Sequence, residues 1–294
     1  MSKYVPDIST RRWVVISPQR LGRPEEYSKI QKGNEKACPF CAGHENETPP
    51  EVFRLGSGEE NKPGWNVRVV PNKYSITDIH EVIIHSPNHR NDIEKLPLDH
   101  VILILKAYRQ RYNIHRKRGQ VLIFSNHGEH AGASLPHPHS QLVVIPSQIN
   151  LDTLVREPLN NVIEESKLFY LYCPDFSQWP YEIWITPKKE DVFFADISDL
   201  EINELAVLMK KMLNRLFHIY NQSSISNLQF GYNYYFYHKE NWYLRIIPRF
   251  IYRAGFELGT GLYVNVVDPM EAALELRGVE KKMIVTLKKL KKYK

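Results

Sequence analysis

The sequence lacks several features that define whole classes of protein. Its apolar runs, such as residues 101–105, are far shorter than the roughly 20 residues that span a bilayer. The first ten residues contain no apolar signal core, so nothing in them indicates secretion. Only 3 cysteines occur in 294 residues, too few for a disulfide framework in a chain of this length. We therefore expect a cytoplasmic protein.

A strong charge of one sign is also lacking. The 39 Lys and Arg residues face 33 Asp and Glu residues, which gives a net charge of +6. This excess suits anionic substrates, but much of it lies in the Lys-rich tail, residues 288–294, which we interpret as a solvated end. The charge alone indicates neither nucleic acid nor a membrane as partner. With 43% apolar and 24% charged residues, the chain can bury a core and is not predominantly disordered.

Hydrophobic periodicity predicts a mixed α+β protein. Short β-branched or aromatic runs bounded by Pro, Asn and Gly indicate strands, and apolar residues at helical spacing indicate two helices. The second helix begins at an S-x-x-E capping box formed by Ser198 and Glu201. Residues 20–64 read as a loop region. The predicted strands are 12–16, 65–70, 80–85, 120–125, 137–145, 167–172, 181–186, 228–237 and 242–247, with helices at about 97–117 and 198–220.

These elements follow the same order twice. Aligning Ile247-Pro248 with Ile145-Pro146 superposes the two halves at a shift of 102 residues. We interpret the chain as two copies of one α+β unit, residues 1–150 and 151–294, joined near 147–166. The alternative is coincidence among generic strands and helices. At this shift His137, His139 and Gln141 fall on Lys239, Asn241 and Tyr243, so only the first copy has an ionisable pair there.

The segment His137-Pro-His139-Ser-Gln141 is the most informative in the chain. Alternate side chains of a strand share a face, so these three polar groups should point the same way. The Gly-rich residues upstream, 126–134, offer backbone N–H groups to an anion. A neutral imidazole can attack phosphorus and form a phosphoramidate. We therefore expect phosphate held beside a histidine nucleophile; the alternative is a surface strand with chance polar residues.

A thiol pair occurs at Cys38-Pro-Phe-Cys41, the short ligand spacing that zinc sites favour. A thioredoxin-like redox pair would lie at a strand–helix junction, whereas this pair lies in a Pro/Gly-rich loop. Two further ligands are required and the chain has 12 histidines. His89 and His137 are candidates, and His44, three residues after Cys41, is a possible decoy.

The chain resembles the galactose-1-phosphate uridylyltransferase family of the histidine-triad superfamily. Five blocks in the family's order carry this resemblance over most of the chain: residues 13–24, 38–41, 67–72, 86–89 and 132–141. The resemblance implies duplicated histidine-triad-like units, each an antiparallel half-barrel sheet with a packed helix. It also implies a transferase of carbohydrate (galactose) metabolism that acts on a nucleotide sugar, and a homodimer in which second-half residues complete the partner's site.

The same resemblance implies roles for individual residues. His139 is the nucleophile, which becomes linked to a nucleoside monophosphate, and Gln141 marks a transferase where hydrolytic relatives tend to have a third histidine. One structural zinc ion per chain is implied at Cys38, Cys41, His89 and His137, because four protein ligands leave no open position. Contacts with the nucleotide or its phosphates are implied for five residues: Arg20, Arg23, Asn72, Asn126 and Ser134.

The chain also departs from the family pattern. A second metal site of the better-known uridylyltransferases uses an H-x-H pair where residues 242–247 stand here, so we predict no second metal. Residues 253–269 lack the Glu and Gln that those enzymes use on the hexose and look more like the nucleotide-sugar phosphorylase branch. Three functions therefore stay open: a UDP-glucose–hexose-1-phosphate uridylyltransferase, an ADP-glucose phosphorylase using inorganic phosphate, and a nucleotide hydrolase or non-catalytic nucleotide-sugar binding module.

Overall fold

The computed structural model describes residues 2–7, 13–23, 38–151, 154, 159–222 and 229–279. Its centre is one ten-stranded sheet in which every neighbouring pair is antiparallel, in the order β3-β4-β5-β7-β6-β11-β12-β10-β9-β8. The strands of the first half are β3 (Phe53–Gly56), β4 (Trp65–Pro71), β5 (Ile79–Ile84), β6 (Gln120–His127) and β7 (His139–Ile145). Those of the second half are β8 (Val162–Glu165), β9 (Phe169–Tyr172), β10 (Ile183–Pro187), β11 (Tyr232–Phe236) and β12 (Leu244–Pro248).

The two halves meet in the middle of this sheet, where β6 pairs with β11. The strand order of the second half is that of the first half reversed, with α2 (Leu98–His115) and α3 (Asp199–Gln222) at equivalent places in the chain. The α+β class with an antiparallel sheet and a helix in each half is therefore confirmed. Because both halves share one sheet, the division at residue 150 stays a prediction.

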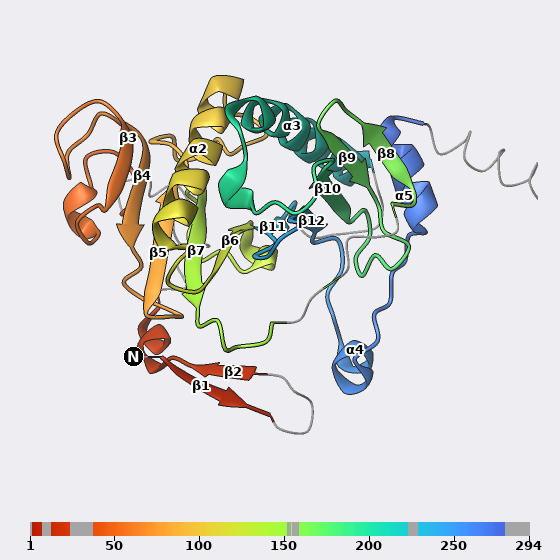
Figure 1. Cartoon of the computed structure of the whole chain (residues 1–294), viewed down its shortest axis with the longest axis horizontal. Helices are drawn as coiled ribbons and strands as arrows, with labels where there is room; N and C mark the ends of the chain where they lie inside the picture. Colours follow the sequence, from red (N-terminus) through yellow and green to blue (C-terminus); the bar gives the residue numbers. More distant parts are fainter. Residues whose placement is uncertain are drawn as a thin grey trace, which may run out of the picture.

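One face of the sheet is covered by α2 and α3, which pack against each other (Figure 1). Side chains of β6 and β11 alternate between buried and partly buried, and the buried ones belong to the core under the helices. The capping box predicted for α3 is present, with N–H groups of Ser198 and Glu201 bonded to each other's side chains at 2.8 and 3.2 Å. The other face of the sheet is free of α2 and α3, and His139 and Gln141 of β7 lie on it.

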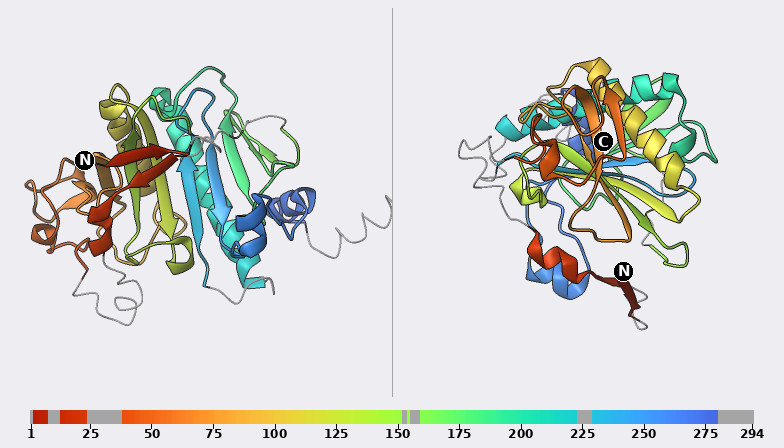
Figure 2. Two further views of the ribbon diagram at one scale, coloured as in Figure 1. Left: turned by 90° about the horizontal axis from the view of Figure 1, so that it is seen from below. Right: turned by 90° about the vertical axis from the view of Figure 1, so that its left-hand side faces the viewer.

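Two projections extend from the body on that second face, as both views show (Figures 1 and 2). One is the hairpin of β1 (Lys3–Pro6) and β2 (Trp13–Ile16), and the other carries α4 (Gly255–Thr260). Helix α5 (Pro269–Arg277) returns to the body and contacts β8 and α3. Short 3-10 helices complete the fold: η1 (Pro18–Gly22), η3 (Glu45–Glu47), η4 (Glu129–Ala131) and η5 (Phe194–Asp196).

The structure corrects two of the sequence predictions. The region 20–64 is not loop alone, because β3 lies within it and pairs with β4. Strand β7 begins at His139 rather than at residue 137, since Pro138 has no N–H to donate to the ladder. The Lys-rich tail, Pro24 and the predicted strand residues Arg12 and Leu228 lie outside the described residues, as do parts of the segments 20–64 and 147–166. None of the described helices combines the length and apolar character needed to cross a bilayer.

Candidate metal and nucleotide-transfer site

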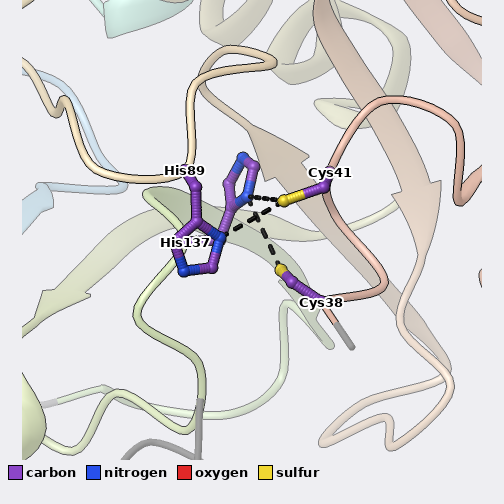
Figure 3. A group of neighbouring side chains, drawn as sticks. All are labelled: Cys38, Cys41, His89 and His137. Atoms are coloured by element: carbon purple, nitrogen blue, oxygen red, sulfur yellow. Dashed lines mark hydrogen bonds between the residues drawn. The ribbon is translucent and has the colours of Figure 1, made fainter. Parts of the chain in front are cut away.

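Four metal-ligating side chains meet at one end of β7 (Figure 3). Cys38 and Cys41 come from the loop before η3, His89 follows β5, and His137 lies two residues before the start of β7. His137 Nδ1 lies 3.6 Å from both sulfur atoms, and His89 Nδ1 lies 3.3 Å from the Cys41 sulfur. These separations match the edges of a tetrahedron whose ligands lie about 2.0–2.3 Å from a common metal ion. The cluster therefore suits a metal ion with two sulfur and two nitrogen ligands.

The surroundings of this cluster fix its ligand atoms. The second nitrogen of His137 donates to the carbonyl oxygen of Ser86 at 2.8 Å, which leaves Nδ1 facing the thiols. Burial lowers the pKa of His137 to about 3 and raises the pKa of the Cys38 thiol to about 12. The imidazole is thus neutral and available, whereas the thiol requires a nearby cation to ionise. The possible decoy His44 pairs with Glu47 at 3.0 Å.

His139 is held as a single tautomer beside this cluster. Its Nδ1 lies 2.8 Å from the carbonyl oxygen of His137, which can only accept, so Nδ1 carries the proton and Nε2 has a free lone pair. Burial, more than any nearby charge, lowers the pKa of His139 to about 4. Phe40, between the two cysteines, packs its ring at 5.3 Å and 67° against the imidazole. The thiol loop therefore also restrains the predicted nucleophile.

A hollow of about 310 Å³ opens in front of His139, and we call it the nucleotide pocket. Six of the predicted site residues line it: Arg20, Arg23, Asn72, Ser134, His139 and Gln141. Arg20 donates to the Tyr74 carbonyl at 3.0 Å and Arg23 to the Gly132 carbonyl at 3.2 Å, which ties both guanidinium groups to its rim. Two arginines at the mouth of a pocket that holds a neutral imidazole suit a phosphate-bearing ligand.

Asn126 lies apart from the six residues that line the nucleotide pocket. It lies on β6, the strand next to β7, and does not line the nucleotide pocket. Its side-chain oxygen accepts from Asn233 at 2.8 Å, and both asparagines line a second hollow over β6, β11 and β12. Gly128, two residues after Asn126, has a positive φ of 89°. A Cβ at this position would lie 3.0 Å from the carbonyl oxygen of Phe230, so the close approach of this loop to the start of β11 requires glycine.

His80, which no sequence pattern singled out, controls the side chain of Gln141. The N–H of Ile76 donates to His80 Nδ1 at 2.9 Å, so the proton of His80 is on Nε2. That Nε2–H donates to the Gln141 side-chain oxygen at 2.9 Å, which leaves the amide N–H groups of Gln141 free to point into the nucleotide pocket. Burial lowers the pKa of His80 to about 4, which keeps it neutral. As the first residue of the predicted strand 80–85, it gave no signal of this role.

A buried acid also escaped the sequence analysis. Asp92 lies under the helix-covered face between the rings of His85 and His127, at 2.6 and 2.8 Å. Burial opposes its ionisation, but the two imidazoles hold its pKa well below the ordinary value. The arrangement ties the segment after β5 to the end of β6, and so supports the strands that flank β7.

The chain is similar in sequence to several known proteins. The family model described as galactose-1-phosphate uridyl transferase, N-terminal domain, matches residues 77–145. An ADP-glucose phosphorylase of Arabidopsis thaliana is 30% identical over 93% of this chain and 92% of its own length. A galactose-1-phosphate uridylyltransferase of Thermotoga maritima is 24% identical over 92% of this chain and 96% of its own.

Solved structures agree with the sequence matches. A crystal structure of the Arabidopsis thaliana ADP-glucose phosphorylase with bound ADP-glucose superposes with a TM-score of 0.71 and 28% identity, covering 95% of this chain and 100% of that one. A uridylyltransferase structure has the same TM-score at 22% identity and covers 96% of this chain and 99% of its own, which supports the fold.

Proposed function

The chain belongs to the galactose-1-phosphate uridylyltransferase family, and from this premise we propose that it transfers a nucleoside monophosphate from a nucleotide sugar to a phosphate acceptor through a covalent bond to His139. The observation that carries the proposal is the single tautomer of His139, with Nε2 free at the edge of a pocket that two arginines line. The names of the relatives support a transferase as the enzyme class.

Two displacements make up the reaction. His139 Nε2 attacks the α-phosphorus, an N–P bond forms, and the sugar 1-phosphate leaves with the electron pair of the broken P–O bond. An acceptor phosphate oxygen then attacks the same phosphorus and the N–P bond breaks. The Nδ1 proton stays on the ring throughout, because the His137 carbonyl at 2.8 Å stabilises the positive charge of the substituted imidazole.

Charge on the transferring phosphoryl group is stabilised by Arg20, Arg23 and the amide of Gln141, all of which line the nucleotide pocket. The hydrogen bond from His80 gives Gln141 the orientation in which it donates. Ser134 lines the same pocket and Asn72 lies beside His80, so they complete the set of residues proposed to contact the nucleotide. Asn126, which lies beside the pocket, is proposed to contact the departing phosphate.

Inorganic phosphate is the acceptor that we favour. The relative with the higher identity is an ADP-glucose phosphorylase, at 30% against 24% for the uridylyltransferase. Transfer to a hexose 1-phosphate, as in a UDP-glucose–hexose-1-phosphate uridylyltransferase, is the second candidate. A panel that crosses ADP-glucose and UDP-glucose with phosphate and galactose 1-phosphate separates the two by which pair gives product.

We propose Zn²⁺ for the cluster of Cys38, Cys41, His89 and His137, because two thiolates and two imidazoles in a tetrahedron are typical of structural zinc. When bound, the ion would brace the segment that presents His139 and would leave no open position for a substrate. A reducing compartment such as the cytoplasm would keep the thiolates available.

A homodimer is also part of the proposal. The projection that carries α4 exposes large apolar side chains to solvent, among them Leu258 at 79%, Leu262 at 60% and Phe256 at 54%. Such a group is typical of an interface. Light scattering should give twice the mass of one chain, and charged substitutions at Leu258 should give single chains.

The covalent step has a direct test. Protein incubated with nucleotide sugar radiolabelled in the α-phosphate should retain label through a bond that is acid-labile and base-stable. His139→Ala should retain none, while His218→Ala, a change on the exposed surface of α3, should label normally. Label on the His139→Ala protein would refute the assignment. Release of free nucleoside monophosphate without an acceptor would indicate a hydrolase, and binding without label or turnover in the unmodified protein would indicate a non-catalytic module.

A further inference from the structure

A second hollow, of about 730 Å³, lies beside the nucleotide pocket on the same face of the sheet. We call it the distal pocket. Its walls combine aromatic rings, side-chain amides and guanidinium groups. No aspartate or glutamate is among the described residues that line it. A large basic hollow without an acid suits an anionic ligand.

The arginines of the distal pocket are not equivalent. Arg245 is buried and bonded to both carboxylate oxygens of Glu182, at 2.7 and 2.8 Å, so its charge is already compensated. The guanidinium groups of Arg249 and Arg253 instead stack on Trp179, with centroid distances of 4.3 and 4.6 Å. These two arginines are the ones available to a ligand.

Neither has a carboxylate partner within ion-pair distance among the described residues. Arg249 Nε is buried without a hydrogen-bond acceptor in the described part of the chain. Among the described residues, the one hydrogen-bond acceptor of Arg253 is the side-chain oxygen of Gln178, at 3.4 Å. The nearest acid in sequence, Glu257, accepts from the backbone of Ala254 at 3.0 Å and does not line the pocket.

The two positively charged guanidinium groups on the Trp179 ring repel each other when no anion is bound nearby. Burial and the charge of Arg253 both lower the pKa of Arg249, so both disfavour the charged form of this side chain. A carboxylate or phosphate bound beside these guanidinium groups would offset the repulsion and accept charge-assisted hydrogen bonds from them. Trp179 would hold the two groups in place for such a ligand.

The sheet register gives the distance of this site from the nucleophile. Ser125 pairs with Ser140 at the end of the β6–β7 ladder, so the next residue of β6, Asn126, continues toward His139. Asn233 lies opposite Asn126, and Ile247 lies opposite Asn233. Ile247 is therefore three strands from His139, about 14 Å at the usual strand spacing. Arg249 follows two residues later on the same face. The arginine pair is thus too far away to contact the phosphorus under attack, but within reach of the far end of a sugar attached to it.

We propose that the distal pocket binds the sugar end of the substrate and that Arg249 and Arg253 bind a second negatively charged group on that sugar. The substrate class is a hexose 1-phosphate unit that carries a carboxylate or a further phosphate at its far end. This inference rests on the proposed function for the orientation of the substrate. The basic lining of the distal pocket does not depend on the proposed function.

Binding to His139→Ala protein tests this without any turnover. The probes are glucose 1-phosphate, glucose 1,6-bisphosphate and glucuronic acid 1-phosphate, measured by calorimetry. At least one doubly charged probe should bind about tenfold or more tightly than glucose 1-phosphate, the factor that one charge-assisted hydrogen bond supplies. The comparison of the two doubly charged probes tells phosphate from carboxylate.

Two variants in the same background then locate the effect. Arg253→Gln and Arg249→Gln should each reduce the preference for the doubly charged probe to about threefold or less. Arg116→Gln, which removes a surface arginine paired with Asp196, should leave the preference unchanged. Equal binding of all three probes, or a preference that survives both variants, would overturn the inference. If the preference is observed but the protein with His139 intact shows no transfer with any nucleotide sugar, only the proposed function is overturned.

Discussion

From the hydrogen bond between His80 and Gln141 we predict a change in the rate of nucleotidyl transfer. Replacing His80 by leucine removes the donor that lies 2.9 Å from the side-chain oxygen of Gln141. A neutral hydrogen bond of this kind contributes about 1 kcal/mol, a preference of about fivefold for the amide orientation that donates into the pocket. Without it the amide can turn its oxygen toward the phosphate, which repels instead of donating.

The size of the effect follows from this geometry. Complete loss of the donor in Gln141→Ala should slow formation of the nucleotidyl-enzyme by about 100-fold, as for other donors to a developing negative charge. His80→Leu should slow it by at most about fivefold, because the amide loses only its preferred orientation and is not removed. The double variant should be no slower than Gln141→Ala alone, since His80 acts only through Gln141.

Single-turnover quench experiments with labelled nucleotide sugar measure the rate directly. His80→Gln is the matched control: its amide can donate to Gln141 and accept from the Ile76 N–H, and it should recover most of the rate. Zinc content and the unfolding temperature identify any general damage, because the leucine leaves the Ile76 N–H unsatisfied. If His80→Leu slows the Gln141→Ala protein by the same factor as the unmodified protein, or if His80→Gln is equally slow, the reasoning is wrong.

Three further predictions concern the metal, the aromatic contact and pH. Cys41→Ser should lose about one zinc per chain by elemental analysis and unfold at a lower temperature, because metal binding and folding are coupled; an unmodified protein that is stable and metal-free would contradict this. Phe40→Ala should retain zinc but slow nucleotidyl transfer by about tenfold, because the ring that packs at 5.3 Å against His139 is lost; an unchanged rate would show that the contact is dispensable. The free energy of unfolding should fall as the pH decreases from about 6.5, the ordinary histidine value, toward 4, because the buried His80 has its pKa lowered to about 4 and the unfolded chain binds the proton first. Denaturant titrations of His80→Gln should show a shallower decrease over that window, and an identical slope would exclude His80 as a contributor.

The local patterns of the chain were sufficient for most of the secondary structure. Strands expected at 65–70, 80–85 and 120–125 lie at Trp65–Pro71, Ile79–Ile84 and Gln120–His127. These strands could be predicted because the alternation of apolar and polar residues, and the residues that bound each strand, depend only on neighbours in sequence. The same holds for the capping box of α3 and for the Cys-x-x-Cys pair. Strands β3 and β8 were missed because each is short and lies at an edge of the sheet, where pairing rather than composition decides the structure.

The functional site, like the secondary structure, could be predicted from local sequence patterns only in part. Residue types and spacing pointed to a thiol pair and a histidine nucleophile, while the choice of His89 and His137 as further ligands depended on family resemblance. In the structure these ligands lie 48 and 96 residues from Cys41, and they meet it where the β5–β7 register ends. No local pattern encodes such a contact, because it depends on which strands pair.

The amino-acid sequence by itself determined the repeated α+β order, the family and the chemical identity of the reactive groups, because these depend on residue type and short-range spacing. Only the tertiary structure decided the tautomer of His139, the orientation of Gln141 by His80, and the pair of arginines on Trp179. Each of these depends on a hydrogen bond or a stacking contact between segments far apart in the chain, and a one-residue change in strand register would remove it.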